Sequence, residues 1–391
     1  MREKSHERCF SIADLRELAR RRIPHAVFDY IDGGAEDEIT LTNNRRAFDR
    51  YQLNASALVD VSQIDLSTTV LGEKISMPLL LSPTAMTRLF HHEGEIAVVK
   101  AAQQAGIIYT LSSMSTTSIE DIAESSNTPK WFQIYVWRDR DLLKNFFKRC
   151  KETGYRALCL TVDLPVHGNR ERDLKNGLTI PPRISPKLLL DLFRHPYWTY
   201  HFLQNDAMQL ANVADHGLAS QKQFILKDYI DSQFDPAVTW EDAIWMVEQW
   251  DGPFVIKGIS HSEDAKRAVE IGANAIVVSN HGGRQLDHAP GTLEVLEDIV
   301  ANVGSKIEIL IDGGFRRGTD IIKAIALGAK ACMIGRPYLY GLCAGGKEGV
   351  DRTLQIYQEE LYRNMQLIGC RTISEIDSRI LKKTTELAAI K

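Results

Sequence analysis

The sequence predicts a closed (β/α)8 barrel. From Met77 onward, eight short apolar segments alternate with amphipathic, helix-like segments. Each apolar segment is rich in Val, Ile, Leu or aromatic residues and is bounded by polar residues or Gly, which is typical of parallel strands buried on both faces. A doubly wound open sheet is the alternative, because the number of strands alone does not show that a sheet closes.

The chain divides into an N-terminal extension, the strand and helix repeat, and one long interruption. Residues 1–76 contain "SIADLRELARRRIPHAVFDYIDG", which indicates a helical N-terminal extension, and we expect irregular cover after it. Several helix-like segments of the repeat open with Ser, Asp or Thr and close on Gly, which supplies caps at both ends. The expected strands are residues 77–85, 106–113, 130–136, 157–163, 253–259, 275–281, 307–314 and 331–336.

The interruption, residues 164–235, is a long loop after strand 4 that far exceeds a usual connection between a strand and a helix. It contains "PKLLLDLFRHPYWTYHFL", in which aliphatic and aromatic residues alternate with Lys, Arg and His. An amphipathic segment edged by Trp and Tyr suits the interface of a lipid bilayer. Packing of the same segment on the barrel or on a neighbouring subunit is the alternative.

Composition narrows the class of protein. The 391 residues are 44% hydrophobic and 25% charged with a net charge of -4, so they lack the broad positive field of a nucleic-acid-binding protein. The six cysteines show no C-x-x-C pair and no zinc-like spacing, which predicts reduced cytosolic thiols and no metal site. The N-terminal residues show no secretory signal, and no apolar run approaches the roughly 20 residues that span a bilayer. Any membrane contact is therefore expected to be peripheral.

Polar and ionisable residues gather where the expected strands end. In a (β/α)8 barrel the active site lies at the carboxyl ends of the strands, so these side chains are expected to share one mouth. In chain order they are Pro83, Thr84, Ala85, Ser112, Gln133, Tyr135, Thr161, Asp163, Lys257, Ser279, His281, Asp312, Gly313, Gly314, Gly335 and Arg336.

Two features of this mouth indicate an anionic cofactor. Lys257 lies inside the apolar strand "FVIKGI", where an unpaired charge would cost several kcal/mol, so we expect it to face a bound cofactor rather than solvent. Strands 7 and 8 end in "IDGGFRRGTD" and "IGRPY". Paired glycines, a helix starting near Gly318 and Arg336 together suit a phosphate group, although a tight turn would also explain the glycines.

The stretch "AIVVSNHGGRQLD" supplies a candidate base. His281 ends strand 6, so its imidazole can face the mouth as a base, while Gly282 and Gly283 permit a sharp turn that brings Arg284 back over the same pocket. A purely structural histidine is the alternative, but Asp163 shares the mouth and could orient the imidazole and stabilise its protonated form. A base beside a carboxylate-binding arginine predicts proton abstraction from a 2-hydroxy acid.

These residues resemble the FMN-dependent α-hydroxy acid oxidases and dehydrogenases. The string "SNHGGRQLD" matches that family's signature, and "FDYIDGGAEDE", "PTAM", "QIYV", "TVD", "VIKGI", "DGGFRRGTD" and "IGRP" support the match. The resemblance runs from about Phe10 to Ile373. It implies that residues 1–391 form a single domain, that the cofactor is FMN and that the protein is a homotetramer.

Residue by residue, the resemblance implies that His281 is the catalytic base, with Asp163 as its partner and Lys257 stabilising negative charge on the reduced flavin. It implies a substrate-binding set of Tyr30, Tyr135, Arg170 and Arg284. The implied FMN-binding set is Pro83, Thr84, Ala85, Ser112, Gln133, Thr161, Lys257 and Ser279, with Asp312 at the ribityl chain and the phosphate held by Gly313, Gly314, Phe315, Arg316, Gly335 and Arg336.

Departures from the family pattern bear on the substrate and the electron acceptor. Met114 stands where plant glycolate oxidases carry a tryptophan, which disfavours glycolate. The "HPYW" region and residues 234–259 resemble bacterial respiratory L-lactate dehydrogenases and mandelate dehydrogenases. In those enzymes the long loop is associated with the membrane. We expect no haem domain before residue 1.

The expected reaction is therefore oxidation of L-lactate to pyruvate, with electrons passing to a quinone or cytochrome at the cytoplasmic side of the inner membrane. The alternatives are a cytoplasmic, soluble oxidase that makes hydrogen peroxide, a mandelate dehydrogenase, and a non-catalytic flavin-binding paralogue.

Overall fold

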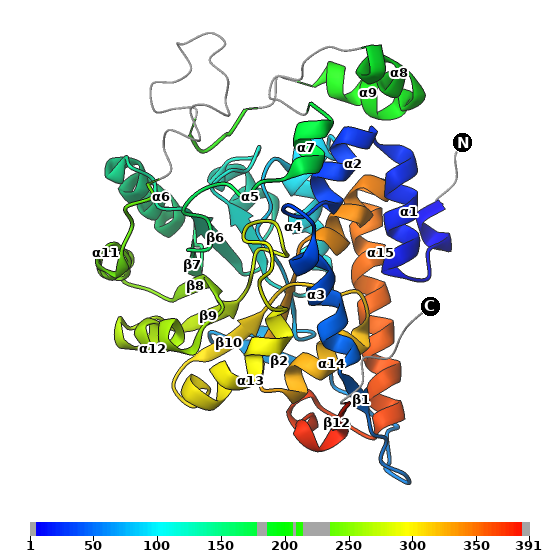
Figure 1. The fold of residues 1–391 in the computed structure, drawn as a ribbon, viewed down its shortest axis with the longest axis vertical. Coiled ribbons are helices and arrows are strands. Elements are labelled where there is room, and N and C mark those ends of the chain that lie inside the picture. Colours follow the sequence, from blue (N-terminus) through cyan, green and yellow to red (C-terminus); the bar gives the residue numbers. More distant parts are fainter. Residues whose placement is uncertain (1–4, 178–185, 206–208, 214–234, 385–391) are drawn as a thin grey trace.

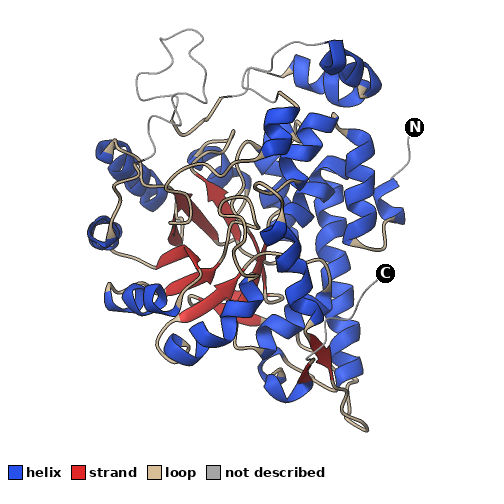
Figure 2. Ribbon diagram, in the orientation of Figure 1, coloured by secondary structure: helices blue, strands red, loops and turns tan. Residues whose placement is uncertain are grey.

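Eight parallel strands close into a barrel at the centre of the molecule (Figure 2). This computed structural model describes residues 5–177, 186–205, 209–213 and 235–384. The hydrogen-bonded order is β10-β11-β4-β5-β6-β7-β8-β9, and β9 pairs with β10 to complete the ring. The predicted (β/α)8 barrel is confirmed and the open sheet is excluded. The strands are β4 (Leu79–Leu81), β5 (Tyr109–Ser112), β6 (Lys130–Ile134), β7 (Ala157–Thr161), β8 (Phe254–Ile259), β9 (Ala275–Val278), β10 (Glu308–Ile311) and β11 (Ala331–Ile334).

Helices surround this barrel (Figure 1). In α6, Asp139 accepts hydrogen bonds from the backbone N–H groups of Asp141 and Leu142, and the apolar residues of the helix turn one buried face to the barrel. The last helix is bent, because Gly345 and Gly346 have non-helical backbone angles. The helices are α4 (Gly94–Ala105), α5 (Ile119–Ser125), α6 (Arg140–Glu152), α11 (Trp240–Trp250), α12 (Ser262–Glu270), α13 (Thr292–Val303), α14 (Gly318–Ala326) and α15 (Arg336–Ile368), with a 3-10 turn η2 (Thr87–Leu89) before α4.

A β-hairpin closes the amino end of the barrel. Strands β2 (Thr68–Val70) and β3 (Glu73–Ile75) pair with each other, and their Val70 and Ile75 are fully buried. Both join one apolar cluster with inward-facing residues of the barrel strands, among them Trp131 and Met333. The hairpin therefore fills the end of the barrel opposite the strand ends that carry the polar residues.

The N-terminal extension is more regular than predicted. After η1 (Ser5–Arg8) it forms α1 (Ile12–Arg22), α2 (His25–Asp32) and α3 (Ile39–Asp49), as expected for a helical segment. The expected irregular cover instead includes the β2–β3 hairpin and β1 (Tyr51–Leu53), which pairs antiparallel with β12 (Leu381–Lys383) near the C-terminus. Short 3-10 turns η3 (Ile373–Glu375) and η4 (Ser378–Ile380) precede β12.

The long interruption contains helices α7 (Glu171–Lys175), α8 (Pro186–Arg194) and α9 (Pro196–Gln204). The Trp198 indole donates to the Leu89 carbonyl at 2.9 Å, and the Asp191 carboxylate accepts from the His25 N–H at 2.7 Å. These bonds hold α8 and α9 beside η2 and the start of α2, and the two helices lie at the upper right of Figure 1. Residues 178–185, 206–208 and 214–234 of the interruption lie outside the described residues. Within the described chain, every helix is too short or too polar to cross a membrane.

The hairpin plug makes a testable contribution to stability. Ile75→Ala removes a buried side chain from the barrel cluster, so we expect a loss of about 2–5 kcal/mol in the free energy of unfolding, measured by denaturant titration. Lys74→Ala, at the exposed neighbouring position of β3, serves as the control and should change little. If the two variants unfolded at the same denaturant concentration, burial of Ile75 in the barrel end would not contribute to stability.

Candidate active site

A cavity of about 1230 Å³, partly open to solvent, lies over the carboxyl ends of the barrel strands. The strands, α2 and the segment before α7 all contribute to its wall. Of the residues predicted for the site, it is lined by Tyr30, Pro83, Thr84, Ala85, Ser112, Tyr135, Thr161, Arg170, Lys257, His281, Arg284, Asp312, Gly313, Gly314, Phe315, Arg316, Gly335 and Arg336.

Three predicted residues lie behind the wall and act on residues that form it. Asp163 contacts His281, the Gln133 amide oxygen accepts from the Ser112 hydroxyl at 2.9 Å, and Ser279 contacts Lys257. The sequence predicts all three at strand ends, but it does not show which residues line the cavity and which lie behind its wall.

His281 and Asp163 form a hydrogen-bonded pair. His281 Nδ1 lies 2.9 Å from Asp163 Oδ1, which leaves Nε2 as the nitrogen available to a substrate. Burial by itself would raise the pKa of Asp163, but the facing His281 outweighs it and keeps the pKa of the carboxyl below its ordinary value. The carboxylate can therefore stabilise a protonated imidazole, as general-base catalysis requires.

The backbone holds His281 in an unusual conformation. Its φ of 55° lies in the left-handed region, which is costly for a residue with a side chain, and the Ser279 hydroxyl accepts from its N–H at 3.1 Å. On β8, Gly258 has φ +111°, and a Cβ there would come within 2.8 Å of the Asp163 backbone nitrogen. Sequence reasoning did not single out Gly258, although an isolated glycine inside an apolar strand is a signal for close backbone approach.

Lys257 is buried and paired. Its Nζ lies 2.8 Å from Asp312 Oδ2 and 2.9 Å from the Ser279 hydroxyl. Burial alone would lower the pKa of Lys257, but the Asp312 and Asp163 carboxylates raise it above its ordinary value, so the ammonium stays charged. Lys257 and Asp312 both line the cavity, and the contact of Lys257 with a bound cofactor stays a prediction.

Two guanidinium groups flank one tyrosine at the entrance of the cavity. The guanidinium carbons of Arg170 and Arg284 lie 5.0 and 5.1 Å from the centre of the Tyr30 ring. Arg284 also donates to the Tyr30 and Gly33 carbonyls at 2.7 and 3.1 Å. Burial, together with Arg170 and Arg336, lowers the pKa of Arg284 to about 9. A carboxylate bound between these cations would relieve their repulsion.

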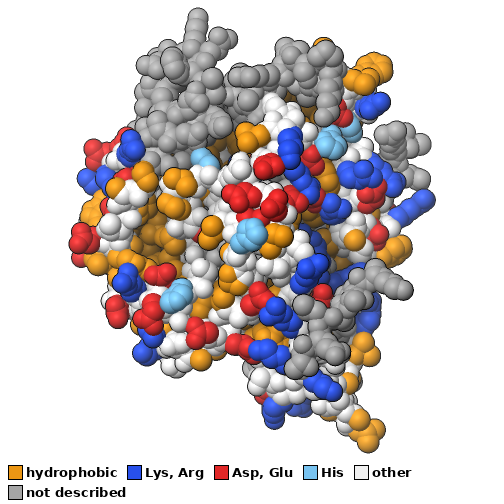
Figure 3. Space-filling view, in the orientation of Figure 1, with side chains coloured by type: hydrophobic (Ala, Val, Ile, Leu, Met, Phe, Trp, Pro, Cys, Tyr) orange, Lys and Arg blue, Asp and Glu red, His pale blue; other side chains and the backbone are white. Residues whose placement is uncertain are grey.

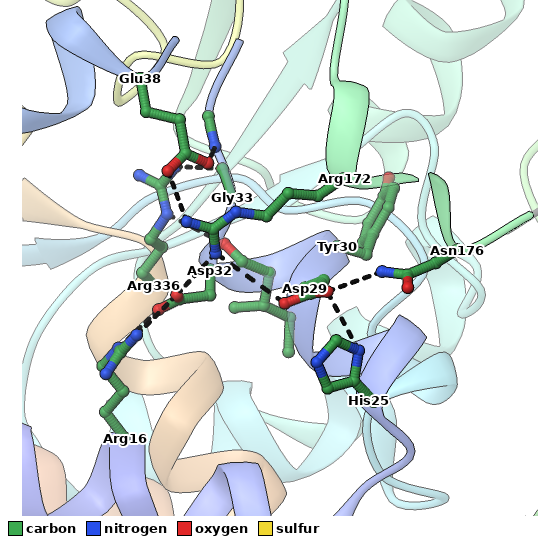
Figure 4. Close-up of polar contacts among 12 residues, drawn as sticks. Arg16, His25, Asp29, Tyr30, Asp32, Gly33, Glu38, Arg172, Asn176 and Arg336 are labelled. Atoms are coloured by element: carbon green, nitrogen blue, oxygen red, sulfur yellow. Dashed lines mark hydrogen bonds and ion pairs between the residues drawn. The ribbon is translucent and has the colours of Figure 1, made fainter. Parts of the chain in front are cut away.

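A network of charged side chains fixes this corner (Figure 4). Arg172, on α7, pairs with Glu38 and lies 3.3 Å from Asp32 on α2, and Asn176 donates to Asp29 at 2.6 Å. Because Tyr30 is on α2 and Arg170 directly precedes α7, these contacts set the spacing between the two residues that line the entrance.

The loops after β10 and β11 form the predicted phosphate region. Gly313 and Gly314 have φ of +97° and +81°, and a Cβ at Gly314 would collide with the Asn44 backbone of α3. Arg316 also lines the cavity. Arg336, which was expected at the phosphate, donates to the Ile31, Gly282 and Gly33 carbonyls at 2.9, 2.8 and 2.8 Å, and Figure 4 shows it beside Gly33. It therefore holds the N-terminal extension over the mouth, and phosphate binding by Arg336 stays a prediction.

Sequence reasoning missed several side chains of the cavity. These lie in loops, away from the strand ends on which the prediction relied, and Met114 was noted only as a departure from the family pattern. They include Phe90, Leu164, His167 and Gln285. Gln285 belongs to the quoted "SNHGGRQLD" motif, which could have identified it.

The residues present fit a flavin mononucleotide. Within the described chain, the buried polar atoms that have no protein partner include Gln133 Nε2, Thr161 Oγ1, Ser82 Oγ and Asp312 Oδ1, all at or next to this cavity. Buried polar atoms are usually satisfied, so such a group of open donors and acceptors indicates a bound polar ligand. The paired glycines and Arg316 suit its phosphate, and when bound the flavin ring supplies a two-electron acceptor.

The chain belongs to the FMN-dependent dehydrogenase family, whose model matches residues 19–383. Its cofactor is therefore FMN, and its reaction is the oxidation of an α-hydroxy acid.

Named relatives differ in substrate and acceptor. The chain is 40% identical to a putative L-lactate dehydrogenase of Mycobacterium tuberculosis, over 97% of this chain and 91% of that protein. It is 44% identical to an L-lactate oxidase of Nostoc sp., over 95% and 97%. A solved structure of the monotopic membrane protein (S)-mandelate dehydrogenase superposes with a TM-score of 0.92 at 40% identity, covering 96% of this chain and 100% of that one.

Replacement of the histidine tests the proposed base. His281→Gln keeps a hydrogen-bonding side chain but not a base, so we expect FMN to stay bound and turnover to fall at least about a hundredfold. Flavin absorbance of the purified variant reports the cofactor, and anaerobic flavin reduction reports the reaction. His288→Asn is the control, since His288 is exposed in the same loop and its φ of 58° suits asparagine. Near-normal reduction by His281→Gln would remove His281 from the mechanism.

Proposed function

We propose that the protein oxidises L-lactate to pyruvate and passes the electrons to a membrane quinone. A cytochrome is the alternative electron acceptor. The observation that carries the proposal is the pairing of His281 with Asp163 at 2.9 Å in the cavity that Arg170 and Arg284 also line. A base and a carboxylate-binding cation pair in one cavity are the two features that oxidation of a 2-hydroxy acid requires.

In this mechanism the arginines and the two tyrosines of the cavity bind and orient the acid. Arg170 and Arg284 take the carboxylate, and Tyr30 and Tyr135 contact its carboxylate or hydroxyl oxygen. His281 accepts the proton of the C2 hydroxyl if C2 loses hydride, or the C2 proton if a carbanion forms, and Asp163 stabilises the resulting imidazolium. Lys257 keeps a positive charge next to the flavin site, where it stabilises the reduced form.

Apolar side chains support an acid with a small apolar substituent. Met114, Phe90, Leu164 and Ala85 line the cavity together with the polar residues. Methionine is flexible and adapts to irregular spaces, so a methyl group or a larger substituent can be accommodated. L-Lactate is the smallest acid of this kind. Mandelate is the second candidate, supported by the close superposition on (S)-mandelate dehydrogenase.

Exposed apolar residues on α8 and α9 support a peripheral membrane contact, while the cytoplasmic side of the inner membrane is implied only by the family resemblance. Phe193 is 83% exposed and Leu203 is 76% exposed, and Leu189, Leu190 and Tyr200 are exposed beside them. Hydrophobic side chains stand at the upper right of the space-filling view, where these helices lie (Figure 3). The homotetramer stays a prediction.

Anaerobic reduction of the bound flavin tests the reaction. On adding L-lactate to the purified protein, we expect the flavin absorbance to bleach within seconds, faster than with glycolate or (S)-mandelate. Under air the reduced flavin should persist and little hydrogen peroxide should form. If hydrogen peroxide formed in proportion to lactate, the electron acceptor would be oxygen rather than a quinone. That outcome would agree with the similarity to an L-lactate oxidase. Flavin that bleaches only with mandelate would overturn the assignment of lactate.

A double substitution tests the membrane contact. Phe193→Ser with Leu203→Ser removes two exposed apolar side chains, so binding to vesicles of phosphatidylethanolamine and phosphatidylglycerol should weaken at least about tenfold in a sedimentation assay. Leu367→Ser is the control, because Leu367 is equally apolar and exposed but lies on α15. Unchanged binding of the double variant would refute a membrane role for α8 and α9.

A further inference from the structure

A second cavity, of about 1810 Å³ and partly open to solvent, lies between α9, the loop from η2 to α4, and the bend of α15. Its aromatic and imidazole lining comes from the loop after η2 and from α9. These side chains are His91, His92, Tyr197, Trp198, His201 and Phe202. The proposed reaction uses none of them.

Imidazole rings form a stack across this cavity. The rings of His91 and His92 lie 4.3 Å apart between centres, and those of His92 and His201 lie 4.0 Å apart with planes 11° from parallel. Burial and the neighbouring imidazoles lower the pKa of His91 to about 3, and the pKa of His92 is lowered by burial and by His201. At neutral pH these two rings are therefore uncharged. Because His91 and His201 cover the two faces of the His92 ring, a ligand would meet the outer rings of the stack and the ring nitrogens.

Phe90 connects the second cavity to the first. Its side chain lines both cavities, and its ring stacks on Tyr30 with 6.1 Å between centres. A ligand in the second cavity would therefore lie next to the entrance at which the hydroxy acid is proposed to bind, without occupying the same space.

Helix α9 also connects the second cavity to the exposed apolar surface. Its Trp198 and His201 line the cavity, while Tyr200 and Leu203 of the same helix are exposed. If α9 contacts a bilayer, a ligand dissolved in that bilayer would meet the helix that also lines the cavity. This entry route favours a lipid-soluble ligand over a water-soluble one.

We propose that the second cavity binds the ring of a quinone, a planar and uncharged ligand with two carbonyl acceptors. Planar rings stack on imidazole and aromatic faces, and the carbonyls accept from imidazole or guanidinium N–H groups. Five cationic side chains, Arg21, Arg22, Arg88, Arg194 and Lys347, also line this cavity, which makes the phosphate of a lipid headgroup the competing occupant. The aromatic side chains of α9 in the lining and the exposed apolar residues on the same helix favour the quinone.

The proposal rests on the proposed function and adds to it the site of the acceptor. Oxidation of one hydroxy acid to its keto acid releases two electrons and two protons. Reduction of one quinone to the quinol takes up two electrons and two protons, so the two reactions balance without a further reactant.

Binding of ubiquinone-1, a short-tailed benzoquinone, tests the site. Isothermal titration of the oxidised, FMN-loaded protein measures its Kd. His92→Phe and His201→Phe keep an aromatic ring in the stack but remove the ring nitrogens, so each should weaken binding at least about tenfold, the equivalent of one lost hydrogen bond. His288→Asn, outside both cavities, should bind as the parent does. Thermal melting checks that each variant is folded.

Anaerobic bleaching of the flavin by L-lactate tests the oxidation of the hydroxy acid independently of quinone binding in the second cavity. We expect both phenylalanine variants to bleach at the parent rate, because neither histidine lines the first cavity. If the parent protein did not bleach, the proposed function would fail whatever the quinone result. Unchanged Kd in both variants, competition between ubiquinone-1 and L-lactate, or binding of glycerol phosphate in place of the quinone would each overturn the quinone site.

Discussion

Compensation of buried charge is the constraint on which the active site depends. Lys257 and Asp312 are buried at the mouth of the barrel, and the side chain of Asp163 is 10% exposed, so an isolated ion at any of these positions would be unstable. The lysine is held by Asp312 and by the Ser279 hydroxyl, and Asp163 is held by His281. Ser279 links the two pairs, since its hydroxyl also accepts from the His281 backbone. The orientation of the base therefore depends on the same contacts that keep the lysine charged.

The barrel alone does not complete this site. Tyr30 comes from α2 in the N-terminal extension, and Arg336, at the start of α15, binds the Ile31 and Gly33 carbonyls that follow it. Arg172 joins the same extension to α7 through Asp32 and Glu38. Three segments that are distant in sequence thus meet at one corner, and charged groups join them there in addition to the apolar core that buries Phe28 and Ile31 of α2.

Periodicity and strand ends were sufficient to predict the barrel and most of the cavity wall. Each strand is short, apolar and followed by a distinctive polar residue, and closure places those residues on one rim. Pairing was harder to predict, because a sequence does not show which buried ions meet. The sequence did not show that Asp312 pairs with Lys257 or that Arg336 donates to backbone carbonyls, and the expected contacts of both residues with the cofactor stay predictions. The histidine stack depends on α9, whose position no local pattern reveals.

The pairing of β1 with β12 has a consequence for synthesis of the chain. Tyr51 lies opposite Lys383, so the extension that carries Tyr30 is tied down by nearly the last described residues. Strand β4 likewise needs β11, which is translated far later, before the barrel can close. Contacts so distant in sequence form slowly. A nascent chain on the ribosome therefore exposes the half-built mouth until β11 and β12 have been made, and a complete site for the flavin can form only after that.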